Sequence, residues 1–118
     1  MRKELSNFLN SPLRNTWLAT PEMSVYVRKG RHLGSDGRLH IFLDIANIEV
    51  QPEFRDQGYF KAFLALCQEI IPYDGILIEN VLNEILHDYL HRLAQQDPQW
   101  IELEWHFRWE NFGRATGI

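Results

Sequence analysis

The stretch Ile48 to Lys61, which reads I-E-V-Q-P-E-F-R-D-Q-G-Y-F-K, decides the fold. Its pattern predicts a strand that ends at Val50, a loop that contains proline, and a helix that begins near Asp56 or Gln57. A glycine at the turn from strand to helix lets the backbone approach a ligand closely. The first N–H groups of a helix have no partner within the helix and therefore attract anions. This stretch accordingly predicts an anion site at a helix N-terminus.

Two strands are predicted before this stretch. Residues 23–33 alternate in polarity, the tetrapeptide G-S-D-G that follows has the composition of a hairpin turn, and residues 38–50 return as the second strand. In the second strand, alternating apolar residues occupy odd positions as far as Ile45 and even positions from Ala46 onward. One extra residue moves all later side chains to the opposite face, so this switch of phase predicts a β-bulge. The alternative is two short strands with a tight bend at Asp44.

Two helices and two further strands are predicted after the stretch. Residues 57–71 carry one apolar stripe at helical spacing, and residues 80–94 carry a second stripe that begins at Leu82. Residues 76–78 form a short apolar run typical of a strand buried on both faces. Residues 100–109 alternate strictly in polarity, which predicts one strand with a solvated face. A strand–helix–strand unit of this length predicts parallel pairing through a crossover.

The two ends of the chain are predicted to be helical and irregular, respectively. Within residues 1–20, an amphipathic helix is expected at Arg2–Asn10, followed by a second helical turn through Trp17 and Leu18. Residues 111–118 contain two glycines and little apolar surface, so we expect a loose tail. The order of elements predicts a single α+β domain around a mixed sheet.

The composition is that of an ordinary globular domain, with 45% hydrophobic and 24% charged residues, and its 118 residues suffice for one core but not two. No apolar run approaches the ~18 residues of a membrane helix, and the N-terminus lacks the apolar segment of a signal peptide. The single cysteine, Cys67, lies on an apolar stripe, which predicts a buried thiol and a reducing, cytoplasmic setting. The formal charge of −4 argues against general binding to nucleic acid, because such proteins are usually basic.

Two segments resemble the GNAT family of acyl-CoA N-acyltransferases. The pyrophosphate loop of that family follows a strand and reads Arg/Gln-x-x-Gly-x-Gly/Ala. The corresponding residues of this chain are Arg55, Asp56, Gln57, Gly58 and Tyr59, followed by Phe60 where a small residue is usual. The later segment I-E-N-V-L-N-E-I-L-H-D-Y-L, residues 78–90, is similar to the family's second strand-to-helix unit, with Asn83 at the position of its helix-opening Asn. The resemblance covers roughly residues 23–93.

The resemblance implies a fold and a ligand. The fold is a GNAT-like α+β domain with a mixed, mostly antiparallel sheet, a bulged central strand and flanking helices. The bulge separates two parallel strands, so that the pantetheine arm of the cosubstrate acetyl-CoA enters between them. The residues implied to contact acetyl-CoA are Ile48, Val50, Arg55, Gln57, Gly58, Tyr59, Phe60 and Asn83.

The resemblance also implies how an acyl group is transferred. An unidentified acceptor amine, on a small molecule or a protein, attacks the thioester directly while a carboxylate takes its proton. Glu49 and Glu79 occupy the family's base positions, with Asp44 as a third candidate. The family's general acid is a Tyr seven residues after the helix-opening Asn; that position is Leu90 here, and Tyr89 precedes it. The alternatives are a solvated or salt-bridged carboxylate in each case, and a core position for Tyr89.

Departures from the family pattern favour a second class of function, a catalytically inactive GNAT-fold protein that binds CoA or a partner protein. The departures are Phe60, the displaced Tyr89 and the short N-terminus. The resemblance is to the small members of the family that are found in bacteriophage and prophage genomes. The aromatic stripe at Trp105, Phe107 and Trp109 is expected to be core, or a homodimer face if the tail leaves it uncovered.

Two polar clusters have weaker claims to be sites. His87 and His91, four residues apart on a helix, can share a zinc ion. However, a helical wheel places His91 nearly opposite the apolar stripe, so a solvated helix face is favoured and no metal ion is expected. Residues 28–32 contain a basic cluster near the hairpin that would suit an acidic partner or the 3′-phosphate of CoA; a solvated hairpin is favoured. The cluster consists of Arg28, Lys29, Arg31 and His32.

Overall fold

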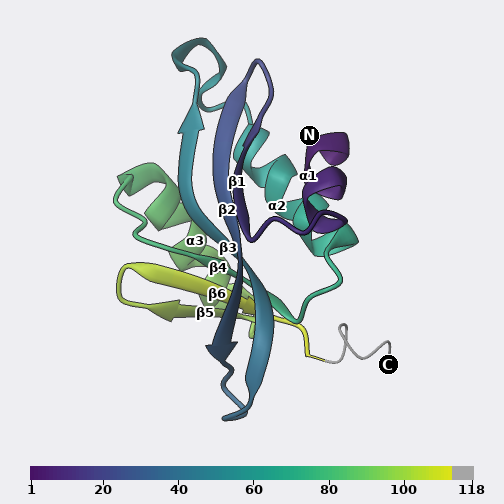
Figure 1. The fold of residues 1–118 in the computed structure, drawn as a ribbon. Coiled ribbons are helices and arrows are strands. Elements are labelled where there is room, and N and C mark those ends of the chain that lie inside the picture. The colour runs from purple at the N-terminus through teal and green to yellow at the C-terminus, as the bar shows by residue number, and fades with distance from the viewer. Residues whose placement is uncertain (113–118) are drawn as a thin grey trace.

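A sheet of six strands organises the structure, a computed structural model that describes residues 1–112. The strands lie in the order β1-β2-β3-β4-β6-β5 (Figure 1). The elements are α1 Arg2–Leu9, β1 Asn15–Ala19, β2 Met23–Leu33, β3 Leu39–Val50, the short 3-10 helix η1 Pro52–Phe54, α2 Tyr59–Ile70, β4 Gly75–Ile78, α3 Glu84–Gln96, β5 Trp100–Leu103 and β6 His106–Glu110. β3 and β4 are parallel, and the other neighbouring pairs of described strands are antiparallel. The predicted mixed, mostly antiparallel sheet is confirmed.

The predicted bulge lies in β3. Tyr26 of β2 pairs with Asn47, and the next residue, Val27, pairs with Ile45, so Ala46 is an extra residue on β3. β3 nevertheless runs without a break across this point. The switch of phase is therefore confirmed as a bulge in one long strand, and the alternative of two short strands is wrong.

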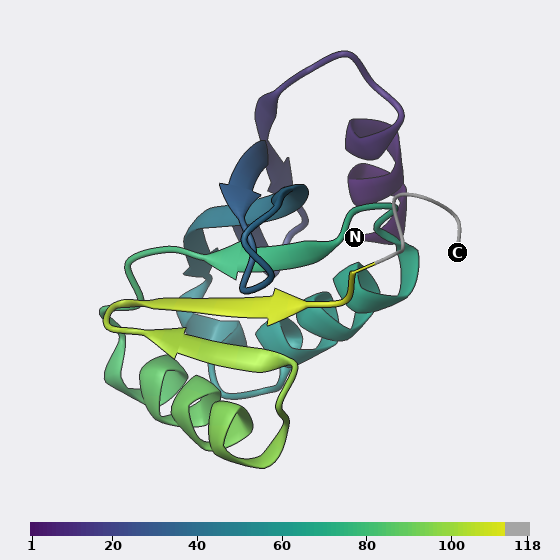
Figure 2. The same ribbon diagram turned by 90° about the horizontal axis from the view of Figure 1, so that it is seen from below.

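All three described α-helices pack on one face of the sheet. The main core cluster joins the helices to one pleat face of the strands, and its buried members include Leu5, Phe8, Leu18, Val25, Val27, Leu43, Ile45, Phe63, Leu64, Cys67, Ile76, Ile78, Leu90, Phe107 and Trp109. Figure 2 shows α2 and α3 next to one another on the same side of the strands. Phe42 and Leu77 are buried outside this cluster, because their side chains project from the opposite pleat face. We call that face, which no helix of residues 1–112 covers, the open face.

The helices begin slightly later than predicted. α2 begins at Tyr59 after Gly58, rather than near Asp56, and α3 begins at Glu84 rather than at residue 80. Asn83 caps α3, since its side chain accepts a hydrogen bond from the N–H of Leu86 at 3.0 Å. Cys67 on α2 is buried as predicted, and burial raises the pKa of its thiol.

The prediction that the apolar stripe of α3 is buried is wrong for the first residues of that stripe. Leu82 is 75% exposed and Ile85 is 67% exposed, whereas Leu90, further along the helix, is fully buried. The first turn of α3 therefore extends beyond the core that the rest of the helix covers.

The single strand predicted for residues 100–109 is wrong. This segment forms the β5–β6 hairpin, with Leu103 opposite His106 and a turn at Glu104 and Trp105. Glu104 has a φ of 57°, as a two-residue hairpin turn requires at its first loop position. Trp105 consequently lies in the turn and is 58% exposed, so the predicted aromatic stripe is core only at Phe107 and beyond.

Of the two helical segments predicted within residues 1–20, the structure contains only the first. Helix α1 matches the expected amphipathic helix, but Trp17 and Leu18 lie in strand β1 and not in a second helical turn. β1 pairs with β2 at the edge of the sheet. Leu18 joins the core, while the ring of Trp17 lies on the open face with its centroid 5.3 Å from that of Tyr26.

The start of the expected tail is held in place. The N–H of Asn111 donates to the carbonyl oxygen of Asp74 at 2.8 Å, and the ring of Phe112 stacks on His40 with centroids 3.9 Å apart. The remainder of the expected tail, residues 113–118, lies outside the described residues. No helix in the described part of the chain is long and apolar enough to cross a membrane.

Candidate functional site

The candidate site begins where the two parallel strands part. β3 and β4 pair as far as Ile45 and Ile78, and the N–H of Glu79 donates to the carbonyl oxygen of Ile45 at 3.0 Å. At the next residue β3 forms its bulge, and β4 has ended, so the last part of β3 pairs only with β2. Ligands of sheets with parallel strands bind beyond the carboxyl ends of those strands. This is therefore the part of the fold where a ligand site is expected.

The unpaired edge of β3 presents the backbone of Ile48 and Val50. The N–H of Gln51 donates to the carbonyl oxygen of Glu22 at 2.9 Å, so Gln51 is directed toward β2. Successive residues of an antiparallel ladder direct their backbone groups to opposite sides. Ile48 and Val50 therefore direct their N–H and carbonyl groups away from β2. An extended ligand can bind there to both groups of Ile48 and to the N–H of Val50, whereas the carbonyl oxygen of Val50 accepts from Arg55.

The loop after β3 brings a cation and free N–H groups together. Nε of Arg55 donates to the carbonyl oxygen of Val50 at 3.1 Å, and in the described chain the rest of the guanidinium has no partner. Gly58 precedes α2 with a φ of 82°, which favours glycine, and no side chain caps this helix. Among residues 1–112, none accepts a hydrogen bond from the N–H groups of Tyr59 and Phe60. This arrangement suits a phosphate or diphosphate group.

Three further residues of the loop and of the first turn of α2 surround that site. Asp56 is exposed with a φ of 61°, and its negative charge opposes the binding of an anion. Phe60, the departure from the family pattern, is half-buried and packs against the main core cluster. Its ring is thus accommodated by the core. Gln57 is tied within the loop, since its Nε2 donates to the carbonyl oxygen of Glu53 at 2.9 Å.

On the open face, two acidic residues flank the point where the strands part. Glu79 forms a hydrogen-bonded ion pair with Arg28 of β2, which raises the pKa of Arg28. Nε of Arg28 also lies 4.0 Å from Oδ2 of Asp44 on β3. One guanidinium therefore links a carboxylate at the end of β4 to a carboxylate just before the bulge.

Asp44 is the buried member of this group. It is 3% exposed, and burial raises the pKa of its carboxyl, although His32 and Arg28 oppose that shift. Nε2 of His32 lies 2.8 Å from Oδ1 of Asp44. Gly30, between Arg28 and His32 on β2, has no side chain, and the carboxylate lies in the space that one would fill. A carboxyl with a raised pKa paired to a histidine is suited to accepting or relaying a proton.

The other two candidate catalytic residues lie apart from this group. Glu49 projects from β3 after the bulge and is exposed, and its carboxylate has no hydrogen bond or ion pair within residues 1–112. Tyr89 is half-buried between α3 and α2, with Nζ of Lys61 4.5 Å from its ring centroid. Asn83 is committed to capping α3 through its side chain. The structure thus separates Glu49 and Tyr89 from Asp44 and Glu79.

The basic cluster predicted to be solvated is largely engaged. Arg28 and His32 bind the carboxylates of the open face, and Nζ of Lys29 donates to the carbonyl oxygen of Ser11 at 2.6 Å. Of the four residues, Arg31 alone is exposed. The prediction is wrong for Arg28, Lys29 and His32, because two carboxylates and the carbonyl oxygen of Ser11 lie within reach of their side chains.

The two histidines of α3 differ in their surroundings. His91 is exposed, and its Nδ1 lies 2.5 Å from Oε1 of Glu102. His87 is half-buried with its ring centroid 5.2 Å from that of Phe107, so the predicted solvated face is wrong for His87. Within residues 1–112, no three His, Cys, Asp or Glu side chains are arranged to hold a metal ion.

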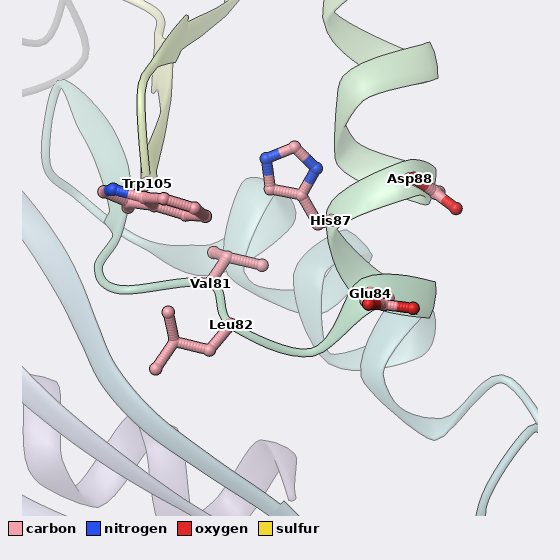
Figure 3. Close-up of a pocket in the computed structure, with 6 residues that line it drawn as sticks. All are labelled: Val81, Leu82, Glu84, His87, Asp88 and Trp105. Carbon is pink, nitrogen blue, oxygen red and sulfur yellow. The ribbon is translucent and has the colours of Figure 1, made fainter.

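A hollow of about 210 Å³ lies between the start of α3 and the β5–β6 turn; we call it the Trp105 hollow. In Figure 3, Trp105 and His87 stand on either side of it, Val81 and Leu82 lie between them, and two acidic residues project from α3. The residues that line it are Val81, Leu82, Glu84, His87, Asp88 and Trp105. The N–H of Val81 donates to the carbonyl oxygen of Trp105 at 2.8 Å, which fixes the loop after β4 to the hairpin turn.

Sequence reasoning missed His32 and Gly30 as parts of the site. A signal for them exists, because the hairpin turn fixes the register of β2 on β3. Counting back from the pair Leu33–Leu39 places Arg28 opposite Asp44, with His32 four pairs nearer the turn on the same pleat face. The ion pair between Arg28 and Glu79 had no such signal, since it depends on the parallel register of β3 and β4.

No protein-family model matches the sequence, and no curated protein matches it. Among solved structures, the chain is similar to a Tyr-to-Phe mutant of the AtaT toxin bound to the C-terminus of the antitoxin AtaR and to acetyl-CoA. The two share 12% sequence identity with a TM-score of 0.59 over 80% of this chain. The match spans 62% of the AtaT chain. At this identity the likeness shows a common fold, and the GNAT-like fold expected from the sequence is confirmed.

Proposed function

We propose that this chain is an acyl-CoA-dependent N-acyltransferase that transfers an acetyl group from acetyl-CoA to an amine. The observation that carries the proposal is the parting of β3 and β4 at Ala46 next to the uncapped start of α2. In this proposal the backbone groups of Ile48 and the N–H of Val50 bind an extended pantetheine arm, and the loop binds the diphosphate. The acetyl-CoA in the AtaT structure of the same fold supports this choice of ligand.

The proposed reaction is a direct transfer. The nitrogen lone pair of a neutral amine attacks the thioester carbonyl carbon, the C–S bond breaks, and the thiolate takes up a proton. Glu79 or Glu49 accepts the proton that the amine loses, with Asp44 and His32 close to Glu79 through Arg28. Tyr89 is the proposed donor of a proton to the thiolate. Holding the two reactants together in this geometry supplies much of the rate.

A second function is favoured by one observation. Glu79, a proposed catalytic base, is already paired with Arg28 in the chain. A GNAT-fold protein that binds CoA without transferring the acyl group would tolerate such pairing. The two functions differ in whether bound acetyl-CoA releases its thiol when an amine is added.

The first test is calorimetric titration with acetyl-CoA, compared with acetyl-pantetheine, which lacks the diphosphate. We expect the full cosubstrate to bind at least about tenfold more tightly, because charged contacts to phosphate contribute on the order of 1.5–3 kcal/mol. Gly58→Trp should abolish binding by filling the loop. Gly58→Ala is the matched control, since both replacements strain a φ of 82° but only tryptophan adds bulk.

Absence of acetyl-CoA binding to the native protein contradicts both functions above. Binding that Gly58→Trp and Gly58→Ala weaken equally contradicts the proposed diphosphate site. Binding without thiol release, across a panel of amines, favours the non-catalytic function.

A further inference from the structure

We propose that the Trp105 hollow binds an alkylammonium group of the acceptor, and that this group is a second cation, separate from the nitrogen that is acylated. The inference rests on the proposed function and names its acceptor class. The reacting nitrogen must be neutral to attack, whereas a nitrogen held by negative charge stays protonated. One amine cannot fill both roles, so the acceptor carries two basic groups.

The charge around the hollow selects a cation. Of the six residues that line it, Glu84 and Asp88 are carboxylates and none is lysine or arginine. Both are exposed and have no ion pair among the described residues. Both lie on the first two turns of α3 at the rim of the hollow, and Figure 3 shows the carboxylate of Asp88 on the side of α3 away from Trp105. An incoming ammonium group therefore meets uncompensated negative charge.

The apolar part of the hollow suits an alkyl chain that ends in a cation. Trp105 is held in a tight turn with 58% of its surface exposed, and Leu82 beside it is 75% exposed. An exposed indole ring attracts ammonium groups through its π face. The hollow's 210 Å³ corresponds to roughly seven water-sized groups. That is room for a short aliphatic chain.

The hollow is fixed relative to the proposed reaction centre. The N–H of Asn80 donates to Nδ1 of His106 at 3.1 Å, and the N–H of Val81 donates to Trp105, so the loop after Glu79 is bonded to the hairpin turn. In the sheet, β6 is adjacent to β4, and β4 is adjacent to β3. Across the sheet, two strand spacings, roughly 10 Å, separate β6 from β3, and the hollow lies beyond the end of β6. The two basic groups of the acceptor are expected to be at least about this far apart.

Two sources supply this chemistry: a free diamine or polyamine, and a lysine side chain with a second basic residue nearby in a polypeptide. The experiment follows the indole N–H resonance of Trp105 by NMR while four probes are added. The probes are 1,5-diaminopentane, spermidine, a Lys-Ala-Lys peptide with blocked ends, and 1-pentanol as the neutral control. We expect saturable shifts with the cationic probes, weakened by salt, and none with pentanol.

Variants locate the binding site. Glu84→Gln and Asp88→Asn should each weaken the binding of the best cationic probe about twofold to fivefold. Trp105→Ala, followed through the backbone N–H of Val81 because the indole is lost, should weaken it at least about fivefold, and Trp105→Phe should restore part of the affinity. Trp17→Ala is the matched control, because it removes an exposed tryptophan from the other side of the sheet. Thermal melting of each variant checks that the fold is intact.

Three results would overturn the inference: no binding of any cationic probe, equal binding of pentanol, or native affinity in Trp105→Ala. A preference for the polyamines over the peptide identifies the first source, and the reverse preference identifies the second. Titration of acetyl-CoA into the same samples separates the two proposals. If acetyl-CoA binds and the amines do not, the inference fails while the proposed function stands; if the amines bind and acetyl-CoA does not, the proposed function fails.

Discussion

The carboxylate of Asp44 lies in the space that a side chain at Gly30 would need: a Cβ built on Gly30 would be 2.1 Å from Oδ2 of Asp44. The same Cβ would be 2.7 Å from Nε2 of His32. Gly30 is therefore required for space, and not for a positive φ. Its lack of a side chain allows His32 to reach Asp44 along one face of β2.

The first prediction concerns this contact. Gly30→Ala should lower the free energy of unfolding by about 1–3 kcal/mol, because the added methyl group overpacks a buried site. Asp44→Ala removes the obstructing carboxylate, so adding Gly30→Ala to that background should cost much less. Chemical denaturation of the two single variants and the double variant measures this coupling. Additive costs would show that Gly30 and Asp44 do not compete for the same space.

The second prediction concerns the charge of Asp56 beside the start of α2. Asp56→Asn should raise the affinity for acetyl-CoA about twofold to fivefold at low salt, because a like charge opposes the anion near a helix N-terminus. Asparagine tolerates the φ of 61°, so stability should change little. Calorimetry at two salt concentrations measures the effect, which should shrink at high salt. Glu104→Gln, an exposed change in the β5–β6 turn, should leave the affinity unaltered.

The third prediction separates the proposed base from its alternatives. Glu79→Gln keeps a hydrogen-bond acceptor for Arg28 but removes the proton acceptor, so acetyl transfer should fall on the order of 100-fold or more. The affinity for acetyl-CoA should stay within about twofold, since the change removes an interaction with the acceptor's proton and not with the cosubstrate. Thiol release in the presence of an active amine measures turnover.

Glu49→Gln is the companion variant for this test. If it lowers turnover and Glu79→Gln does not, the base is on β3 beyond the bulge. Full activity in both variants contradicts the assignment of either carboxylate.

The fourth prediction concerns the pH dependence of stability. His40 is hydrogen-bonded to Asp74 on one side and to Asp36 on the other, an arrangement that we call the His40 clamp. Hydrogen bonds to Asp74 and Asp36 raise the pKa of His40 above its ordinary value of 6.5. Stabilisation from this group is fully present below pH 6.5 and is lost as the pH rises through the raised pKa. The pKa of Asp36 is lowered below 3.8, chiefly by the N–H of Arg38, so its contribution is lost only as the pH falls through that lowered value. The clamp therefore stabilises the fold most between pH 3.8 and 6.5.

Thermal melting at pH 5.5 and pH 8.5 tests the clamp. The native protein should melt at a higher temperature at pH 5.5, and His40→Gln should remove most of the difference. His91→Gln, which changes an exposed histidine on α3, should leave the difference in place. A native protein that melts at the same temperature at both pH values contradicts the prediction.

The sequence predicted the bulge because β3 is buried on one face, so an extra residue leaves a visible change of phase at Ala46. It failed at the β5–β6 hairpin for a related reason. Apolar residues continue to alternate through Glu104 and Trp105, and the turn lacks the glycine or asparagine that usually marks a tight hairpin. Trp100 has an even number and Trp109 an odd one, so a single strand would direct them to opposite faces. Because the two-residue turn intervenes, they pair with each other and both face the core.

The candidate site was predictable where it depends on local backbone. The strand end at Val50, the glycine at residue 58 and the cap at Asn83 all carry short sequence signals. The partner of Glu79 depends on the parallel register of β3 and β4, which no local pattern encodes, whereas the partners of Asp44 follow from the register of the β2–β3 hairpin. The Trp105 hollow was missed because it forms only once the hairpin turn places the indole beside α3.

The bulge at Ala46 means that a single residue keeps the end of β3 open. Without that residue, Ile45 and Asn47 would be consecutive and would alternate in face without interruption against Val27 and Tyr26. In a straight β3, the final residues would be free to form backbone hydrogen bonds with the residues after Ile78. This pairing would close the sheet where a ligand is proposed to enter. We expect an in-frame deletion of one codon to convert an open scaffold into a sealed one. Selection for binding can thus act on the presence of one extra residue in β3, here an alanine.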